Sequence, residues 1–340
     1  MRHAEAVLLK AWQRRGPLAC ALLPVALLFR LLAGLRRLLF RTGILKSSRL
    51  PVPVIIVGNI FIGGTGKTPL TIWLVQELRR AGFTPGVISR GYGSSLERPT
   101  AVTPGSMPAE VGDEPVLIAA RTQCPLMVGR NRVEAAKALL AGNPEIDVIV
   151  SDDGLQHYAL QRDVEIVLCD ERGEGNGWML PAGPLREPAS RRRDFTVVNA
   201  PALPATAIQP AYHMLLAGDL AERLSDRMQT IPLSSLCAMP ASRIWAAAGI
   251  GNPARFFSML EKAGVQASTL ALPDHYDFAD NPFAGIEADI ILITEKDAVK
   301  CARIDMLKND PRLWVVPVTA RIDRVLAERI VEKCRGRPTA

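Results

Sequence analysis

A glycine-rich stretch with one lysine and one threonine is the part of the chain best suited to phosphate chemistry. It follows an apolar run at residues 54–57 and reads Phe61-Ile62-Gly63-Gly64-Thr65-Gly66-Lys67-Thr68. Backbone N–H groups of such a loop can face phosphate oxygens, the Lys67 ammonium can neutralise the β- and γ-phosphates, and the Thr68 hydroxyl can contact Mg²⁺. The usual spacing has glycine where Phe61 stands, so the pattern predicts a variant P-loop that binds a nucleotide.

Two pairs of adjacent carboxylates are the next candidates. Asp152 and Asp153 follow an apolar run that begins at residue 146, where an acid opposite the P-loop threonine can hold Mg²⁺. Adjacent residues at a strand end point to opposite sides, so these acids are expected to differ in role; a helix N-cap is the alternative. Asp113 and Glu114 precede an expected helix, either as a general base or metal contact, or as charges that complement the helix N-terminus.

Two histidines and an arginine could act on a substrate. His157 could contact phosphate, orient an acid, or pack under its loop. Arg90 follows an expected strand at residues 84–89 and could hold an anion at the sheet edge, where ligands collect, or lie in a surface loop. His275 lies in a loop far along the chain and gains a catalytic role only if two domains close so that it faces Asp113.

Short apolar runs alternate with amphipathic stretches, which predicts parallel strands covered by helices. In the first half we expect strands at residues 54–57, 84–89, 146–150, 164–169 and 195–199, and helices at 70–81 and 116–121. In the second half we expect strands at residues 244–250, 268–272, 290–294 and 313–318, and helices at 254–263 and 322–334.

The expected fold is therefore α/β, and 340 residues are enough for two domains. It consists of a P-loop NTPase-type parallel sheet domain over residues 51–205 and a smaller α/β domain over residues 241–340. A crossover is expected over residues 206–240, which are rich in proline and alanine. Six widely spaced cysteines without a Cys-x-x-Cys pair indicate reduced thiols in a cytoplasmic protein, not a disulfide framework or a zinc site.

The chain begins with a basic and apolar head, residues 1–50, which holds ten Lys or Arg and one acid. The other 290 residues hold 31 basic and 33 acidic side chains, and this near-neutral body argues against nucleic-acid binding. Within the head, the apolar run at residues 17–40 is interrupted by Arg30, Arg36 and Arg37, so it is marginal for a spanning helix. A signal peptide and a soluble core helix are alternatives, but we expect an N-terminal membrane-interface helix whose arginines meet anionic lipid.

Taken together, the motifs resemble the tetraacyldisaccharide 4'-kinases of lipid A synthesis, P-loop kinases. The resemblance extends in matching order from the head to about residue 300, and only Leu155, where an aromatic residue is common, departs mildly from it. The matching segments are Val57-Gly58-Asn59, Gly63-Gly64-Thr65-Gly66-Lys67-Thr68-Pro69, Ser89-Arg90-Gly91-Tyr92-Gly93, Val111-Gly112-Asp113-Glu114, Asp152-Asp153-Gly154-Leu155-Gln156-His157, Gly183-Pro184-Leu185-Arg186-Glu187, Gly249-Ile250-Gly251-Asn252-Pro253 and Thr294-Glu295-Lys296-Asp297.

This resemblance implies an enzyme with two α/β domains that close over ATP. It implies transfer of phosphate from ATP to the 4'-hydroxyl of a tetraacylated glucosamine disaccharide 1-phosphate, a lipid A precursor, to give lipid IVA. ATP and Mg²⁺ would be the cofactors, and the lipid disaccharide and an anionic membrane surface the partners, with no obligate protein partner. The enzyme would be peripheral or monotopic at the cytoplasmic face of the bacterial inner membrane.

The resemblance also implies roles for individual residues. Asp113 matches the family's catalytic acid and His275 the histidine that pairs with it, and together they would take the proton from the sugar hydroxyl. Residues 61–68 would bind the nucleotide, with Lys67 acting on the phosphates. Thr68, Asp152 and Glu114 would hold the metal ion, and the residues that would contact or support the substrate are Asp153, His157, Arg90, Arg186 and Glu187.

Two other functions share some of these features. A membrane-associated P-loop NTPase switch without a lipid acceptor would have the same loop, the Asp152 strand and the apolar head, but needs neither His275 nor a second domain. A soluble P-loop kinase of a small metabolite would use the head as a core helix.

Overall fold

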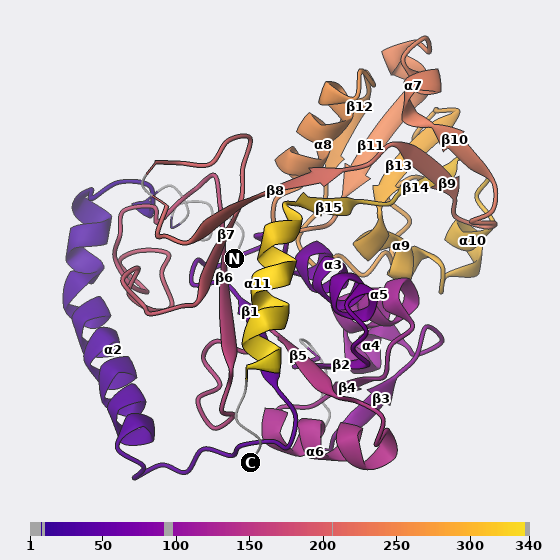
Figure 1. The fold of residues 1–340 in the computed structure, drawn as a ribbon. Coiled ribbons are helices and arrows are strands. Elements are labelled where there is room, and N and C mark those ends of the chain that lie inside the picture. The colour runs from indigo at the N-terminus through magenta and orange to yellow at the C-terminus, as the bar shows by residue number, and fades with distance from the viewer. Residues whose placement is uncertain (1–7, 9–10, 92–97, 206, 337–340) are drawn as a thin grey trace.

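Two sheets organise the chain, and the computed structural model describes residues 8, 11–91, 98–205 and 207–336 (Figure 1). The larger sheet has nine strands, in the spatial order β15 (Thr319–Ile322), β8 (Ala211–Ala217), β7 (Phe195–Asn199), β6 (Val164–Asp170), β1 (Val54–Gly58), β5 (Val148–Asp152), β2 (Pro85–Ser89), β4 (Leu126–Val128) and β3 (Thr100–Val102). The seven strands from β8 to β4 are parallel, and β15 and β3 are antiparallel at the two edges.

Helices cover both faces of this sheet, which is why β1, β5 and β7 are buried along their whole length. On one face lie α3 (Lys67–Arg80), α5 (Asp113–Thr122) and α11 (Arg324–Arg335), with the short α4 (Pro108–Val111) before α5. On the other face lie α6 (Arg132–Gly142) and the loops that contain Leu155 and Leu185. The carboxyl ends of the central strands are left for the site.

The smaller sheet has six strands, in the order β10 (Thr230–Pro232), β9 (Leu220–Arg223), β14 (Leu313–Val316), β13 (Ile290–Thr294), β11 (Ile244–Ala248) and β12 (Ser268–Ala271). The four strands from β14 to β12 are parallel. One face packs against α7 (Leu233–Leu236) and α8 (Pro253–Lys262), and the other against α9 (Glu295–Cys301) and α10 (Asp305–Lys308). A 3-10 turn, η1 (Ala241–Arg243), leads into β11.

The expected α/β fold with a P-loop-type parallel sheet and a second α/β part is confirmed, but two of its boundaries differ. Residues 206–240, expected as a crossover, contain the strands β8, β9 and β10. The end of the chain, β15 and α11, returns to the larger sheet instead of staying with the smaller one. The helix expected at 116–121 begins at Asp113, so Asp113 and Glu114 lie in its first turn and not in the preceding loop.

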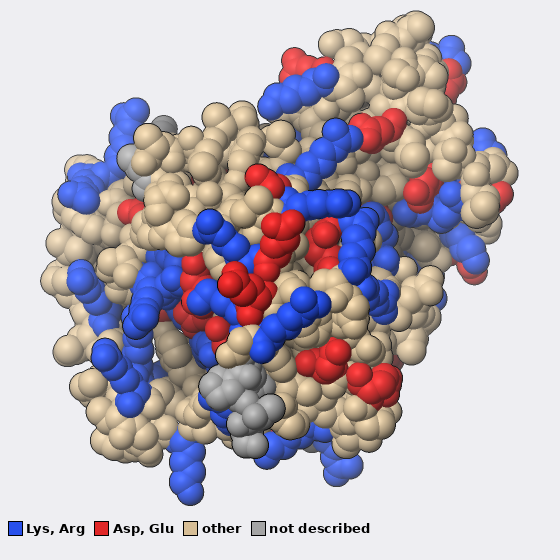
Figure 2. All heavy atoms as spheres, in the orientation of Figure 1, with Lys and Arg blue, Asp and Glu red and all other residues tan. Residues whose placement is uncertain are grey.

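The head forms the helix α2 (Pro17–Arg41), which lies at the side of the molecule away from both sheets (Figure 1). Only Ala19 and Ala26 of this helix are buried, which contradicts a soluble core helix. Judged by length and composition alone, α2 could cross a membrane. On the side where α2 lies, Figure 2 shows basic side chains separated by uncharged ones, and the exposed side chains of α2 include seven leucines.

Polar contacts dock the segment before α2 onto the loop between β6 and β7. The Trp12 indole N–H donates to the Pro181 carbonyl at 2.9 Å, and the Asn176 backbone N–H donates to the Trp12 carbonyl at 2.8 Å. Arg15 Nε donates to the Asn176 carbonyl at 3.1 Å, and its guanidinium lies over the Trp178 ring. The segment around Trp12 and Arg15 is therefore fixed to the body of the protein.

Candidate active site

The P-loop connects the end of β1 to the start of α3 and is shaped by two glycines with left-handed backbone. Gly63 has φ of 98° and Gly66 has φ of 99°. A Cβ at Gly66 would also stand 2.6 Å from Asn199 Nδ2, which donates to the Thr65 carbonyl at 2.9 Å. Position 66 therefore needs glycine both for its backbone angle and for space.

Lys67 stands at the first position of α3 with its ammonium held inside the site. Its Nζ donates to Asn59 Oδ1 at 3.2 Å and lies 3.7 Å from Asp153 Oδ1. Asn59 in turn donates from Nδ2 to the Gly63 carbonyl at 3.1 Å, so one amide links the lysine to the loop backbone. Phe61, where the usual motif has glycine, is covered by the Arg172 guanidinium at 4.3 Å from its ring centroid. An aromatic residue is thus accommodated by stacking.

Asp152 and Asp153 have different surroundings, as expected for neighbours at a strand end. Asp152, the last residue of β5, is fully buried and accepts hydrogen bonds from Thr71 Oγ1 at 3.2 Å and Ser89 Oγ at 3.4 Å. Burial, together with the nearby Glu114 carboxylate, raises the pKa of Asp152 above its usual value. A buried carboxylate in this position is stabilised as an anion by an added cation.

Asp153 follows with φ of 49°, a conformation that costs a non-glycine residue about 1 kcal/mol or more. Its Oδ2 accepts from Arg186 Nη1 at 3.4 Å, on the side opposite the contact with Lys67. Burial raises its pKa, but the charges of Lys67 and Arg186 outweigh this and hold the pKa below the usual value. Asp153 is therefore an anion with basic partners, whereas Asp152 has hydroxyl partners.

Asp113 and His275 meet across the two sheets. Asp113 is the buried first residue of α5, and its Oδ2 lies 3.1 Å from Nδ1 of His275, which sits in the loop after β12 with φ of 58°. Burial raises the pKa of Asp113, but the hydrogen bond from His275 and the charges of Lys296 and Lys300 lower it to about 2. The hydrogen bond to Asp113 raises the pKa of His275 above its usual value.

Helix α9 of the smaller sheet brings further charges to α5. Lys296 Nζ lies 3.1 Å from Glu114 Oε1 and 3.6 Å from Asp274 Oδ1. Glu295 is 5% exposed and accepts two contacts from Arg121 Nη1, at 2.6 and 2.7 Å. Each of the two helices therefore contributes one acidic and one basic side chain to ion pairs that connect the two sheets.

The turn between β11 and α8 lies directly on the P-loop. A Cβ on Gly251 would stand 2.8 Å from the Gly64 backbone nitrogen, so only glycine permits this approach. Arg255 of α8 donates to the Thr65 carbonyl at 3.2 Å and to Asp170 Oδ2 at 2.9 Å. Residues of the smaller sheet thus contact the loop expected to hold phosphate.

His157 lies among arginines on the other side of Asp153. Burial, followed by the charges of Arg132, Arg162, Arg36 and Arg90, lowers the pKa of His157 to about 4. Its Nε2 is buried and has no hydrogen-bond partner among the described residues. The arginines around the neutral imidazole create a positive electrostatic potential, which favours an anionic group at this place. Tyr92 and Gly93, near Arg90 in sequence, lie outside the described residues.

Glu187 is held by the protein itself, since it accepts from Gln156 Nε2 at 2.8 Å, Tyr158 OH at 2.6 Å and Arg191 Nε at 3.1 Å. Its position is therefore that of a supporting residue. Arg191, which adjacent arginines in sequence would place on a solvated face, is instead 3% exposed and also pairs with Glu165 at 2.7 Å.

The residues proposed for Mg²⁺ carry oxygen donors, the type that this ion prefers. The Thr68 hydroxyl belongs to the P-loop, and Asp152 has Glu114 and Asp153 as its acidic neighbours. A divalent cation fits such a concentration of carboxylates. Among the described residues, no group of three metal-ligating side chains is found.

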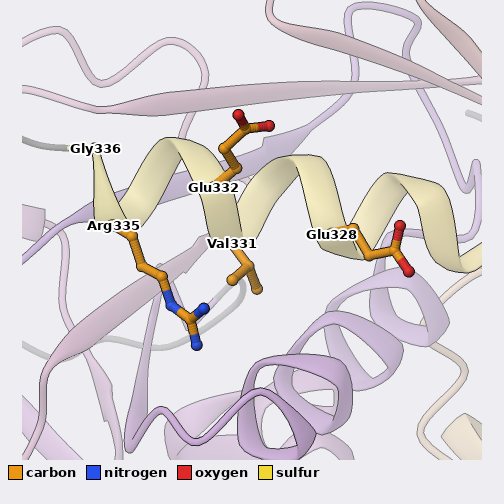
Figure 3. Close-up of a pocket in the computed structure, with 5 residues that line it drawn as sticks. All are labelled: Glu328, Val331, Glu332, Arg335 and Gly336. Carbon is orange, nitrogen blue, oxygen red and sulfur yellow. The ribbon is translucent and has the colours of Figure 1, made fainter.

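A shallow hollow beside α11 is a different feature (Figure 3). It is lined by Glu328, Val331, Glu332, Arg335 and Gly336, none of which is a proposed site residue.

Several residues that shape the site were given no role by the sequence. Asn59 and Ser89 stand in segments that match the family and Thr71 stands in none, but the partners of all three are seen only in the folded chain. Lys296 lies in a segment that matches the family but was given no role, and Arg255 lies in none of the matching segments. Both are brought to the site by the contact between the sheets, which local sequence does not encode.

Comparisons with known proteins agree with this geometry. The model of the family "Tetraacyldisaccharide-1-P 4'-kinase" matches residues 18–335. The chain is 64% identical to a tetraacyldisaccharide 4'-kinase of Janthinobacterium sp. (strain Marseille), covering 99% of this chain and 98% of the relative. It is 60% identical to one of Herminiimonas arsenicoxydans, covering 97% and 96%.

A solved structure is similar over nearly the same extent. LpxK from Aquifex aeolicus, crystallised in complex with ATP, superposes with a TM-score of 0.78 at 28% identity, covering 93% of this chain and 99% of that one. Since the family match spans almost the whole chain and the relatives align along their full length, the chain belongs to the tetraacyldisaccharide-1-P 4'-kinase family.

Proposed function

We propose that the chain transfers the γ-phosphate of ATP to the 4'-hydroxyl of a tetraacyldisaccharide 1-phosphate, a lipid A precursor, to give lipid IVA. The observation that carries this proposal is the Asp113–His275 contact, because it joins an acid of the larger sheet to a histidine of the smaller one beside the P-loop. A nucleotide switch has no need of such a pair. The two parts built on the two sheets are proposed to close over ATP.

The P-loop is proposed to bind the triphosphate. Residues 61–68 direct backbone N–H groups at phosphate oxygens, and Lys67 neutralises the charge that moves between the β- and γ-phosphates. Thr68, Asp152 and Glu114 would hold Mg²⁺, which would supply positive charge to stabilise the phosphates.

His275 is proposed as the group that takes the proton of the sugar hydroxyl. With Nδ1 donating to Asp113, the neutral imidazole carries its lone pair on Nε2. The Asp113 carboxylate stabilises the imidazolium that forms, and this makes the histidine a stronger base. The positive φ of His275 is a local strain of the kind found at functional sites.

The arginines around His157 are proposed to receive the anionic sugar. Arg90 and Arg186 flank this region with exposed or half-exposed guanidinium groups, and Arg186 also orients Asp153. Arginine suits phosphate because its planar fork donates two parallel hydrogen bonds. Glu187 supports this loop through its own three partners.

The head is proposed to rest on an anionic membrane, at the cytoplasmic face of the inner membrane. The exposed large apolar side chains of α2 and the absence of acids in it support interfacial attachment. An acylated acceptor would then be met at the surface in which its chains are embedded.

The direct test is incubation of the purified chain with γ-labelled ATP, Mg²⁺ and the lipid disaccharide monophosphate in detergent, followed by chromatography of the lipid. We expect label in a more polar lipid, and none with Lys67→Ala. Labelled inorganic phosphate released at the same rate with and without the lipid, and no labelled lipid, would point to the NTPase switch instead.

A further inference from the structure

A buried ammonium group lies against the Asp113–His275 pair. Lys300 of α9 places Nζ 3.5 Å from Asp113 Oδ2, the oxygen that also faces His275 Nδ1 at 3.1 Å. Its side chain is 13% exposed, and Nζ makes no hydrogen bond among the described residues. Taking an ammonium out of water is costly unless a carboxylate compensates, and Asp113 is the carboxylate within ion-pair distance.

Aromatic packing restricts where this ammonium can go. Nζ lies 5.6 Å from the centroid of the Phe278 ring, which is 1% exposed. Phe278 is itself held by Tyr276, edge to face at 5.1 Å, and by Phe283 at 6.1 Å. The Lys300 side chain therefore packs on a fixed aromatic ring as it reaches Asp113, and this packing restricts the positions that its ammonium group can adopt.

The other charges at this place have different partners. Lys296, one turn earlier on α9, pairs with Glu114 and with Asp274. Asp274 Oδ1 also lies 3.9 Å from His275 Nε2. Around the imidazole there are thus Asp113 and Glu114 from α5, Asp274 from its own loop, and Lys296 and Lys300 from α9. Of the two lysines, Lys300 is the one whose ion pair is with Asp113.

We propose that Lys300 is a positioning residue for phosphoryl transfer, whose ammonium holds the Asp113 carboxylate so that Oδ2 receives the Nδ1 proton of His275. The neutral ring then keeps its lone pair on Nε2, the nitrogen that would take the sugar proton. This inference rests on the proposed role of His275. Without the ammonium, the carboxylate can rotate, and the imidazole is no longer held in one tautomer.

The test compares Lys300→Met, which keeps length without charge, with Lys300→Arg and with Lys308→Met, an exposed lysine on α10. In ¹⁵N spectra of the histidines in the full chain, assigned with His275→Gln, we expect mainly the Nδ1–H tautomer in the unchanged protein. In Lys300→Met we expect a mixture of the two tautomers. Lys300→Arg restores the tautomer, and Lys308→Met changes nothing.

Kinetics provide the second measurement. Lys300→Met should lower kcat about ten- to a hundredfold with KM for ATP within about twofold. An unchanged tautomer in a folded Lys300→Met overturns the proposal, as does a loss of activity that Lys300→Arg fails to recover. If the unchanged protein labels no lipid, the proposed function fails, while the spectra still decide whether Lys300 orients the pair.

Discussion

The Asp113–His275 pair is a residue-scale device whose pH behaviour follows from its two shifted pKa values. His275 must be neutral to accept a proton, and its pKa is raised by the hydrogen bond to Asp113. We therefore expect kcat/KM to rise with pH through a midpoint above the usual value of about 6.5. His275→Ala should lower kcat by about a hundredfold or more and leave KM for ATP within about twofold. Steady-state rates between pH 5 and 9 test this.

The same pair affects stability in a defined window. Because the pKa of His275 is raised, its contribution is complete below the unfolded value of about 6.5 and is lost as pH rises through the folded value. Because the pKa of Asp113 is lowered to about 2, its contribution is present above about 3.8 and is lost as pH falls. The difference in melting temperature between the unchanged protein and His275→Gln should peak near pH 5. A difference that grows steadily up to pH 8 would contradict this assignment.

Asp152 and Asp153 are adjacent, but we expect different effects when the charge of each is removed by substitution with asparagine. Asp152, buried between hydroxyls, is the proposed metal contact, so Asp152→Asn should raise the Mg²⁺ concentration for half-maximal activity about tenfold or more. Asp153→Asn removes the partner of Lys67 and Arg186 and should lower kcat at saturating Mg²⁺ instead. Titration of activity with Mg²⁺ separates the two. An equal shift in half-saturation for both variants would mean that Asp152 has no special contact with the ion.

The contact between α5 and α9 is the element-scale feature that brings the two halves of the site together. Arg121 of α5 reaches the buried Glu295 of α9, which also accepts from the Val318 backbone N–H at 3.1 Å. We expect Glu295→Gln to lower the free energy of unfolding by about 1–3 kcal/mol, because Arg121 then lacks its counter-charge in a partly buried place. Chemical denaturation monitored by circular dichroism measures the change.

An exposed ion pair provides the control for this prediction. Arg243 and Asp289 pair with side chains that are 57% and 44% exposed. Such pairs contribute little, so Asp289→Asn should leave the midpoint of chemical denaturation nearly unchanged. If Asp289→Asn and Glu295→Gln lower the free energy of unfolding equally, burial at the contact of α5 and α9 does not strengthen its ion pair.

Elements marked by local signals were predictable from sequence. β1 and β5 are short continuous apolar runs that end in glycine or acids, so both the strands and the site at their carboxyl ends could be expected. β8 was missed because most of its side chains are only partly buried and it lacks such a run, and β10 because it has only three residues. The pairing of β15 with β8 joins segments about a hundred residues apart, and no local pattern encodes it. For the same reason, Lys300 could not be assigned to Asp113.

At the scale of the whole molecule, the charge asymmetry of the chain corresponds to a physical separation. The basic residues of α2 lie at one side (Figure 2), while the carboxylates, lysines and His275 of the site lie between the two sheets. The loop between β6 and β7 contacts both regions. It contacts the head at Trp12 and the P-loop through the Ile62 N–H, which donates to the Pro184 carbonyl at 3.0 Å. The segment that leads into α2 is thus held at a fixed place relative to the P-loop.

Membrane attachment through α2 makes a prediction that concerns the whole molecule. Leu28, Leu31 and Leu35 are 55%, 67% and 50% exposed. Burying a leucine in an apolar phase contributes about 1.5–3 kcal/mol, so replacing all three by glutamine should weaken vesicle binding at least a hundredfold. Flotation with vesicles that contain anionic lipid measures this. The body of the protein is untouched, so labelling of a detergent-solubilised acceptor should fall by less than about twofold.

Two controls separate insertion from charge. Met306→Gln, at an equally exposed methionine on α10, should float like the unchanged chain. Replacing Arg30, Arg36 and Arg37 by glutamine removes attraction of about 1 kcal/mol each to anionic headgroups, so it should reduce binding to anionic vesicles and not to neutral ones. If the triple leucine variant still floats while the arginine variant does not, attachment is electrostatic alone. The apolar face of α2 would then need another partner.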